Sequence, residues 1–221
     1  MSYSSPGLRR IHLVRHGEVH NPHHVVYADL PGYGLSDLGS MQAAEAADHL
    51  SSTHVAAIVS SPLDRAVATA REIATRYNLP VEIDERLTEW RLGKRWAGIV
   101  WEDLPKKRPG ELEAYLATPE TIDFAAESLS DLAARMLEAM SYWADRAESS
   151  VLVSHQDPVQ AARRIATDGG FGAFHENKPG HASVTTLARP SGPDRMLEVA
   201  YWEPDQGHGF PPVGEAGVPG S

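Results

Sequence analysis

The sequence predicts an α/β fold, a three-layer αβα sandwich with a mostly parallel central sheet. Short apolar segments typical of buried strands alternate along the chain with longer segments whose apolar residues recur at helical spacing. This alternation is typical of βαβ units, in which helices cover both faces of a parallel sheet. The chain has 221 residues, and at roughly 150 residues per domain this length corresponds to one full domain or at most two small ones.

The N-terminal part is expected to contain three strands and two helices. A buried strand ends abruptly in Arg15-His16-Gly17-Glu18, and a loop rich in Pro, Gly and His follows it. Ser36 is a suitable N-cap for an Ala-rich helix, and Ser61, followed by Pro62, is a suitable N-cap for a second helix. In order, we expect strand 11–14, helix 37–51, strand 55–59, a helix that begins at Ser61 and ends at 77–80, and strand 81–83.

The C-terminal part begins with an irregular stretch, 92–125, in which Gly and Pro recur around a short helix at 111–117. We interpret this stretch as a lid-like insertion. Ser128 with Asp131 is typical of the start of a helix, which we expect to reach about residue 148. The remaining elements are expected at 151–153 (strand), 158–167 (helix), and 184–187 with 196–202 (a final hairpin).

These elements define the expected domain organisation. A single domain is expected over 10–202, with a flexible N-terminus over 1–9. The tail over 203–221 is rich in Gly and Pro and contains no Lys or Arg, and we expect it to be disordered.

Composition excludes several classes of function. The chain has 20 Lys+Arg against 30 Asp+Glu and a net charge of −10, which argues against a nucleic acid or an anionic membrane as partner. The absence of cysteine excludes thiolate metal sites, disulfide scaffolds and a cysteine nucleophile. The sequence contains neither a signal-peptide pattern nor an apolar run long enough to cross a bilayer, so we expect a cytoplasmic protein.

Polar side chains follow three of the expected strands. His16 and His155 come directly after two of them, and Arg65 lies just beyond a third. The carboxyl ends of parallel strands meet at one edge of a sheet, where ligands bind. Arginine can grip phosphoryl oxygens with two hydrogen bonds, and a neutral imidazole can attack phosphorus and carry the phosphoryl group. This edge therefore suits phosphoryl transfer, with a carboxylic acid to protonate the departing alcohol.

The segment Leu13-Val14-Arg15-His16-Gly17-Glu18 resembles the signature of the histidine phosphatase superfamily, in its phosphoglycerate-mutase-like branch. The resemblance covers about residues 10–190, and the supporting motifs follow in the family's order. These are Ser60-Ser61-Pro62-Leu63-Asp64-Arg65-Ala66, then Leu87-Thr88-Glu89 with Gly93, Trp96 and Gly98, then Val153-Ser154-His155, and finally Ala182-Ser183-Val184-Thr185.

The resemblance implies a role for each matching residue. His16 would be the nucleophile that becomes phosphohistidine, and Glu89 would be the general acid and later the base that activates water. The phosphoryl oxygens would be held by Arg15, Arg65 and His155, with further contacts from Asn21 and from the backbone N–H of Gln156. No metal or other cofactor is expected. The histidines at 20, 23 and 24 lack helical metal-ligand spacing, and we interpret them as part of a solvent-exposed or substrate-lining loop.

Two departures from the family pattern bear on function. Gln156-Asp157-Pro158 stands where relatives usually follow the second histidine with Gly-Gly or Gly-Asp, and Asp29 stands where many relatives carry arginine. The favoured hypothesis is a phosphatase acting on a small phosphomonoester. A mutase that returns the phosphoryl group to its substrate is one alternative, and a degenerate phosphatase that only binds a phosphorylated ligand or a protein is another. The particular substrate and the oligomeric state stay open.

Overall fold

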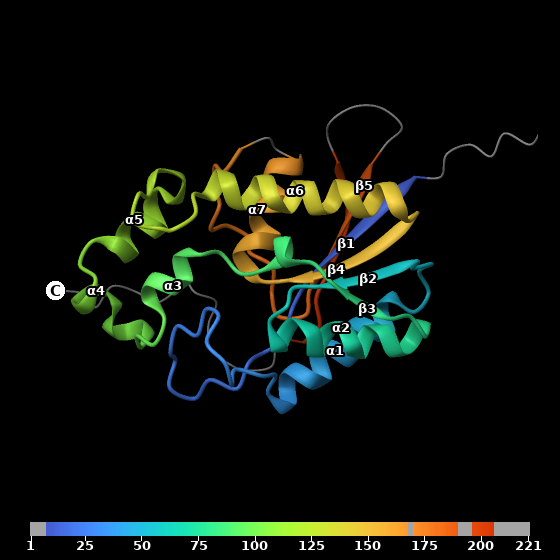
Figure 1. Ribbon diagram of the computed structural model, residues 1–221, viewed down its shortest axis with the longest axis horizontal. Helices are drawn as coiled ribbons and strands as arrows, with labels where there is room; N and C mark the ends of the chain where they lie inside the picture. Colours follow the sequence, from blue (N-terminus) through green and yellow to red (C-terminus); the bar gives the residue numbers. More distant parts are fainter. Residues whose placement is uncertain (1–7, 168–169, 190–195, 206–221) are drawn as a thin grey trace, which may run out of the picture.

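The computed structural model describes residues 8–167, 170–189 and 196–205 (Figure 1). At its centre lies a six-stranded sheet with the strands β1 Arg9–Arg15, β2 Ala57–Ser60, β3 Val81–Ile83, β4 Ser149–Ser154, β5 Val184–Arg189 and β6 Leu197–Trp202. The strand order is β3-β2-β4-β1-β5-β6. The first four strands are parallel, whereas β5 and β6 form an antiparallel hairpin beside β1. The predicted α/β sandwich with a mostly parallel sheet is confirmed.

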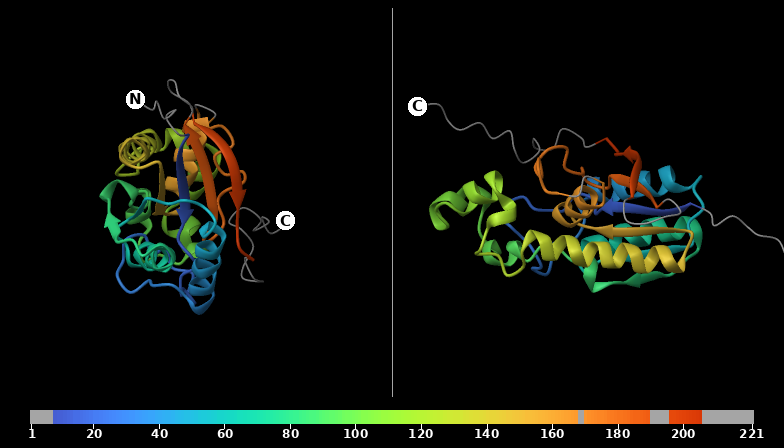
Figure 2. Two further views of the ribbon diagram at one scale, coloured as in Figure 1. Left: turned by 90° about the vertical axis from the view of Figure 1, so that its right-hand side faces the viewer. Right: turned by 90° about the horizontal axis from the view of Figure 1, so that it is seen from above.

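Four long helices cover the two faces of this sheet. They are α1 Asp37–Leu50, α2 Asp64–Tyr77, α6 Leu129–Arg146 and α7 Gln156–Thr167. Figures 1 and 2 show α6 and α7 on one face, and α1 and α2 on the other. Leu13 of β1 packs in the core beneath α6 and α7, while its neighbour Val14 packs beneath α1 and α2. Burial on both faces explains the apolar residues at 11, 13 and 14 of this strand.

The irregular stretch of the sequence forms short helical segments beyond one end of the sheet. After the 3-10 turn η1 Glu85–Leu87, the segments are α3 Leu92–Trp96, η2 Trp101–Asp103, α4 Leu104–Lys107, α5 Glu111–Ala117 and η3 Pro119–Thr121. Figure 1 places α3, α4 and α5 beyond the end of the sheet at which β1 and β4 finish. The rings of Trp96 and Tyr115, 5.5 Å apart, pack within this insertion.

The predicted helix starts are partly right. Ser36 accepts a hydrogen bond from Gly39 N, and Ser128 accepts one from Asp131 N, so both cap helices as expected. The prediction that Ser61 caps the next helix is wrong: α2 begins at Asp64 and its N-cap is Leu63. The Ser61 hydroxyl accepts from Leu63 N at 3.4 Å and bonds His155 Nε2 at 2.8 Å. Helix α7 also begins two residues before Pro158, because proline is tolerated in the first turn of a helix.

The predicted flexible N-terminus and disordered tail lie mostly outside the described residues. Of these segments, the structure describes 8–9, where Arg9 is already the first residue of β1, and 203–205 after β6. Within the described ranges, no helix combines the length and the apolar character needed to span a membrane.

Candidate active site

Three neighbouring strands deliver the predicted residues to one edge of the sheet. Arg15 is the last residue of β1 and His16 follows it, while His155 follows the last residue of β4. Arg65 lies in the first turn of α2, shortly after β2 ends. The rings of His16 and His155 are 5.1 Å apart, and Arg65 Nε lies 3.2 Å from His16 Nε2. The structure therefore brings these side chains together as their positions in the sequence predicted.

The local hydrogen bonds of His16 fix which ring nitrogen is available. Its Nδ1 lies 2.7 Å from the carbonyl oxygen of Gly17. A carbonyl only accepts, so Nδ1 carries the hydrogen and the lone pair is on Nε2, which faces Arg65. Burial, together with the charge of Arg65 and the proximity of His155 and Arg15, lowers the pKa of His16 well below its usual value. The imidazole is therefore neutral, and its unprotonated nitrogen is Nε2.

A close backbone contact holds the turn that carries His16. A Cβ atom on Gly17 would lie 2.3 Å from Gly39 O, and a Cβ atom on Gly39 would lie 2.0 Å from Glu18 O. Only glycine at both positions allows this approach. The Thr69 hydroxyl accepts from Gly17 N at 3.1 Å, and Gln42 Oε1 accepts from Glu18 N at 2.9 Å. The turn is thereby fixed to both α1 and α2.

Arg65 is buried, with 2% of its surface exposed. Its Nη2 donates to Ala28 O at 2.7 Å, and its guanidinium lies 4.7 Å from the centre of the Tyr27 ring. The loop between β1 and α1 is therefore held against the site by Arg65 and by the cation–π contact. Burial lowers the pKa of Arg65, but arginine starts from a pKa above about 12 and stays charged.

Arg15 is oriented by the segment that precedes β5. Its Nη1 donates to Pro179 O at 2.9 Å, and its Nη2 donates to His181 Nε2 at 2.7 Å. Burial and the charge of Arg15 lower the pKa of His181 to about 2, so this imidazole is neutral. Arg15 Nε is buried and has no hydrogen-bond partner among the described residues. An anion at this position would supply the missing acceptor.

His155 is fully buried between Ser61 and Glu89. Its Nε2 bonds the Ser61 hydroxyl at 2.8 Å, and its Nδ1 lies 3.9 Å from Glu89 Oε2. At that distance Nδ1 makes no hydrogen bond to Glu89, and it has no other partner in the described part of the chain. Burial and nearby arginines lower the pKa of His155 well below its usual value. After Arg15 Nε, His155 Nδ1 is thus a second buried atom without a hydrogen-bond partner among the described residues.

Glu89 follows the turn η1 and brings a carboxyl group to the same edge. Its Oε1 accepts from Trp90 N at 2.8 Å. Burial, and next the negative charge of Asp157, raise the pKa of Glu89 to about 7, against the opposing effects of Arg65 and Arg15. A carboxyl group with this pKa can both donate and accept a proton near neutral pH.

Arg135 of α6 holds the backbone that carries Glu89. Its Nη1 donates to Arg86 O at 2.6 Å and to Thr88 O at 2.8 Å, and its Nη2 donates to Glu89 O at 3.1 Å. The carboxylate of Glu127 accepts from the same guanidinium at 2.6 and 3.0 Å. This ion pair was not predicted from the sequence, because Glu127 and Arg135 are eight residues apart, whereas side chains pair along a helix at spacings of three or four.

The two predicted substrate contacts lie in different settings. The Asn21 side chain donates to Val25 O at 2.9 Å and accepts from Val25 N at 3.0 Å, so both ends of its amide close a local loop. Gln156 is the first residue of α7, whose N-terminal N–H groups point outward from the helix.

Asp29, at the position where many relatives carry arginine, forms an ion pair with Lys94 at 2.7 Å and thereby links its loop to α3.

The histidine-rich loop does not assemble a metal centre in the structure. His24 Nδ1 lies 2.8 Å from Glu102 Oε1. Among the described residues, no group of three or more His, Cys, Asp or Glu side chains is arranged to hold a metal ion.

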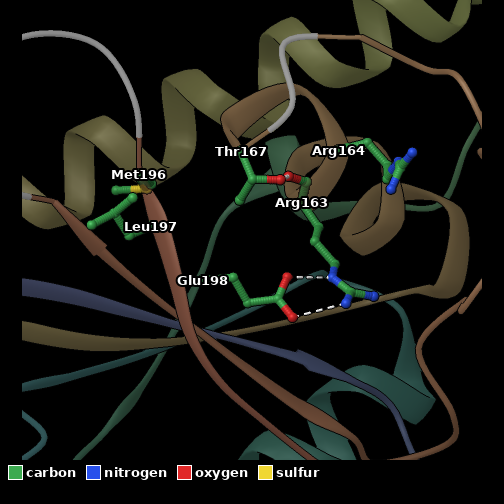
Figure 3. Close-up of a pocket in the computed structure, with 6 residues that line it drawn as sticks. All are labelled: Arg163, Arg164, Thr167, Met196, Leu197 and Glu198. Atoms are coloured by element: carbon green, nitrogen blue, oxygen red, sulfur yellow. Dashed lines mark hydrogen bonds and ion pairs between the residues drawn. The ribbon is translucent and has the colours of Figure 1, made fainter.

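A surface pocket of about 250 Å³ lies away from this cluster (Figure 3). An ion pair between Arg163 and Glu198, at 2.5 Å, crosses it. Met196 and Leu197 line its other side. Because it borders the C-terminal half of α7, whereas Gln156 begins that helix beside His155, the pocket is separate from the site described above.

The chain belongs to the histidine phosphatase superfamily (branch 1), whose family model matches residues 11–200. It is 37% identical over 209 residues to an uncharacterized protein of Mycobacterium tuberculosis (strain CDC 1551 / Oshkosh), covering 90% of this chain and 98% of that relative. A glucosyl-3-phosphoglycerate phosphatase of the same strain is 35% identical over 214 residues, covering 89% and 93%. The predicted family resemblance is confirmed.

Solved structures agree with this assignment. The native structure of a mycobacterial glucosyl-3-phosphoglycerate phosphatase has a TM-score of 0.76 and 28% identity, covering 87% of this chain and 97% of that one. The structure of that phosphatase in complex with inorganic phosphate has a TM-score of 0.74 and 27% identity, covering 89% and 97%.

Proposed function

We propose that the chain is a metal-independent phosphatase that hydrolyses a small phosphomonoester through a phosphohistidine intermediate on His16. The observation that carries the proposal is the tautomer of His16, which directs an unprotonated Nε2 towards Arg65 in a buried site. The buried guanidinium of Arg65, the half-buried guanidinium of Arg15 and the carboxyl group of Glu89, with a pKa of about 7, lie around it. Phosphatase relatives, one of them solved with inorganic phosphate, support the same reading.

The first step transfers the phosphoryl group to the protein. Arg15, Arg65 and His155 hold the non-bridging oxygens and offset their charge. The lone pair of His16 Nε2 forms a bond to phosphorus as the bond between phosphorus and the bridging oxygen breaks. Glu89 donates its proton to that oxygen, so the leaving group departs as a neutral alcohol.

The second step releases phosphate. The Glu89 carboxylate, now without its proton, removes a proton from a water molecule as the water oxygen attacks phosphorus. The bond between phosphorus and Nε2 breaks, and its electron pair returns to His16. The products are inorganic phosphate, a neutral imidazole and a protonated Glu89, which is the state required for the next turnover.

The test compares the wild type with His16→Ala on p-nitrophenyl phosphate and on a panel of phosphomonoesters, at acidic and neutral pH. Wild type is expected to hydrolyse p-nitrophenyl phosphate, and His16→Ala to be inactive. The matched control is His54→Ala, because His54 is exposed and lies in a loop before β2.

Trapping makes the test specific to the covalent step. Wild type quenched during turnover should carry an acid-labile, alkali-stable phosphate that His16→Ala lacks. Activity that survives in His16→Ala, or an inactive wild type across the panel, would refute the proposal. Conversion of phosphoglycerate into its isomer without release of phosphate would favour a mutase instead.

A further inference from the structure

A buried cluster of Asp157, Tyr115 and Lys178 lies beside Glu89. Lys178 Nζ lies 2.7 Å from Asp157 Oδ1 and donates to the Tyr115 hydroxyl, also at 2.7 Å. The Tyr115 hydroxyl lies 3.2 and 3.1 Å from the two carboxylate oxygens of Asp157. The Lys178 and Asp157 side chains are only 10% and 17% exposed. The three residues come from α5, from the first turn of α7 and from the segment before β5.

Two observations show where this cluster lies relative to Glu89. Asp157 lies two residues after His155, whose Nδ1 is 3.9 Å from Glu89 Oε2. On the other side, the Trp90 ring, which follows Glu89 in the chain, lies 6.0 Å from the Tyr115 ring. The cluster therefore lies against residues on both sides of Glu89, namely His155 in space and Trp90 along the chain.

We propose that Asp157 is a positioning residue, whose carboxylate, held by Lys178 and Tyr115, keeps Glu89 protonated until a leaving oxygen takes the proton. This inference rests on the proposed function and assigns a role to the carboxylate that follows His155 by two residues. Lys178 is needed because a second carboxylate at this depth is costly without a cation beside it. The two carboxyl groups thereby have different roles: Asp157 is ion-paired with Lys178, and Glu89 keeps its proton.

The electrostatics of Glu89 agree with this geometry. After burial, the negative charge of Asp157 is the largest influence that raises the pKa of Glu89. The charged and titratable groups around Glu89 come from five helices and strands and from the loops beside them. They are Arg15 of β1, Arg65 of α2, Tyr115 of α5, Arg135 of α6 with its partner Glu127, His155 after β4, Asp157 of α7 and Tyr27 of the loop after β1. Of the two carboxylates in this group, Glu127 is paired with Arg135, and Asp157 adds the negative charge that raises the pKa of Glu89.

The test is the pH dependence of kcat/KM in Asp157→Asn. Phenyl phosphate is the substrate, because phenol resembles the tyrosine side chain in its pKa of about 10 and needs a proton to leave. Without the charge of Asp157, Glu89 loses its proton at lower pH. The alkaline limb of the kcat/KM profile should therefore move to lower pH. At the alkaline end of the profile, kcat/KM should fall about tenfold for each unit by which the Glu89 pKa falls.

Two further variants separate electrostatics from structure. Tyr115→Phe keeps the ring against Trp90 and the ion pair between Lys178 and Asp157, so its alkaline limb should stay where the wild type has it. Glu113→Gln removes an exposed carboxylate from the same helix and should behave as wild type. A uniform loss of rate in Asp157→Asn with an unmoved limb, or an equal movement in Tyr115→Phe, would overturn the inference.

A second readout does not need activity. The carboxyl signals of isotope-labelled glutamate can be titrated by NMR, and Glu89→Gln identifies the signal of Glu89 by its loss. That signal should titrate at lower pH in Asp157→Asn than in wild type, and an identical titration would overturn the inference. If the wild type hydrolyses nothing, the proposed phosphatase activity fails, while this titration still decides whether Asp157 holds the proton on Glu89.

Discussion

The substitution Gly39→Ala should damage the site from a position that no substrate touches. Gly39 lies in the first turns of α1, where alanine is favoured over glycine by about 1 kcal/mol. Its added Cβ, however, would lie 2.0 Å from Glu18 O and 2.7 Å from Glu18 N. Both contacts are with backbone, so no side-chain rotation can relieve them.

The magnitude follows from the size of the overlap. Restoring an ordinary contact of about 3.4 Å requires Glu18 and Gly39 to separate by about 1.4 Å. Overpacking of this kind costs about 3 kcal/mol, so the net loss of stability is about 2 kcal/mol after the gain in helix propensity. For a chain of this length, that loss lowers Tm by about 4–8 °C.

The activity should fall as well. The peptide between Gly17 and Glu18 carries the carbonyl that holds His16 Nδ1, so a displaced Glu18 moves the acceptor that orients the His16 ring. A misplacement of about 1 Å at a reacting group costs roughly a hundredfold in rate.

The assay combines thermal unfolding with kcat for p-nitrophenyl phosphate, and Ser40→Ala, an exposed neighbour in the same helix, is the control. If Gly39→Ala is as stable and active as wild type, or more so, helix propensity outweighs the contact and the reasoning fails.

Two further perturbations test the interior. Arg135→Met should cost about 3–5 kcal/mol in unfolding free energy and lower kcat, because it leaves the buried Glu127 unpaired and frees the backbone of Glu89. Denaturant unfolding measures this loss of unfolding free energy, and the double variant Arg135→Met with Glu127→Gln should recover part of it. A loss below about 1 kcal/mol in Arg135→Met would contradict the role of the ion pair. His12 is buried and has its pKa lowered to about 4, so the unfolded chain binds its proton first as pH falls below about 6.5. Stability should therefore drop from pH 7 to pH 5 by about 2 kcal/mol more in wild type than in His12→Gln; equal drops would contradict this assignment.

The sequence predicted the sheet and the edge where the residues converge, because burial on both faces leaves a clear signal. Leu13 and Val14 enter opposite cores, and burial on both faces favours apolar residues at consecutive positions of the strand. His12 breaks the apolar run and could not be placed from the pattern. It is accommodated because Thr186 Oγ1 and Ser149 Oγ, from the two neighbouring strands, lie 2.9 and 3.1 Å from its ring nitrogens.

The parts of the site that sequence reasoning missed depend on contacts distant along the chain. Ser61 matches a helix cap in sequence, yet its hydroxyl is used by His155, 94 residues away. His181 and Lys178 lie in a Gly- and Pro-containing segment without periodicity, and only the folded chain places them against Arg15 and Asp157. No local pattern encodes these pairings.

The charges of the site favour a dianion over any other ligand state. His16, His155 and His181 all have lowered pKa values and contribute no charge, so Arg15 and Arg65 leave two positive charges at this edge. A phosphomonoester carries about −1.5 to −2 at neutral pH, and it balances these two charges only if Glu89 is protonated. A bound dianion also disfavours ionisation of Glu89 by like-charge repulsion. Under the proposed function, a bound substrate therefore favours the protonated form of Glu89, and protonated Glu89 favours substrate binding. This local charge balance holds although the chain as a whole carries a net charge of −10.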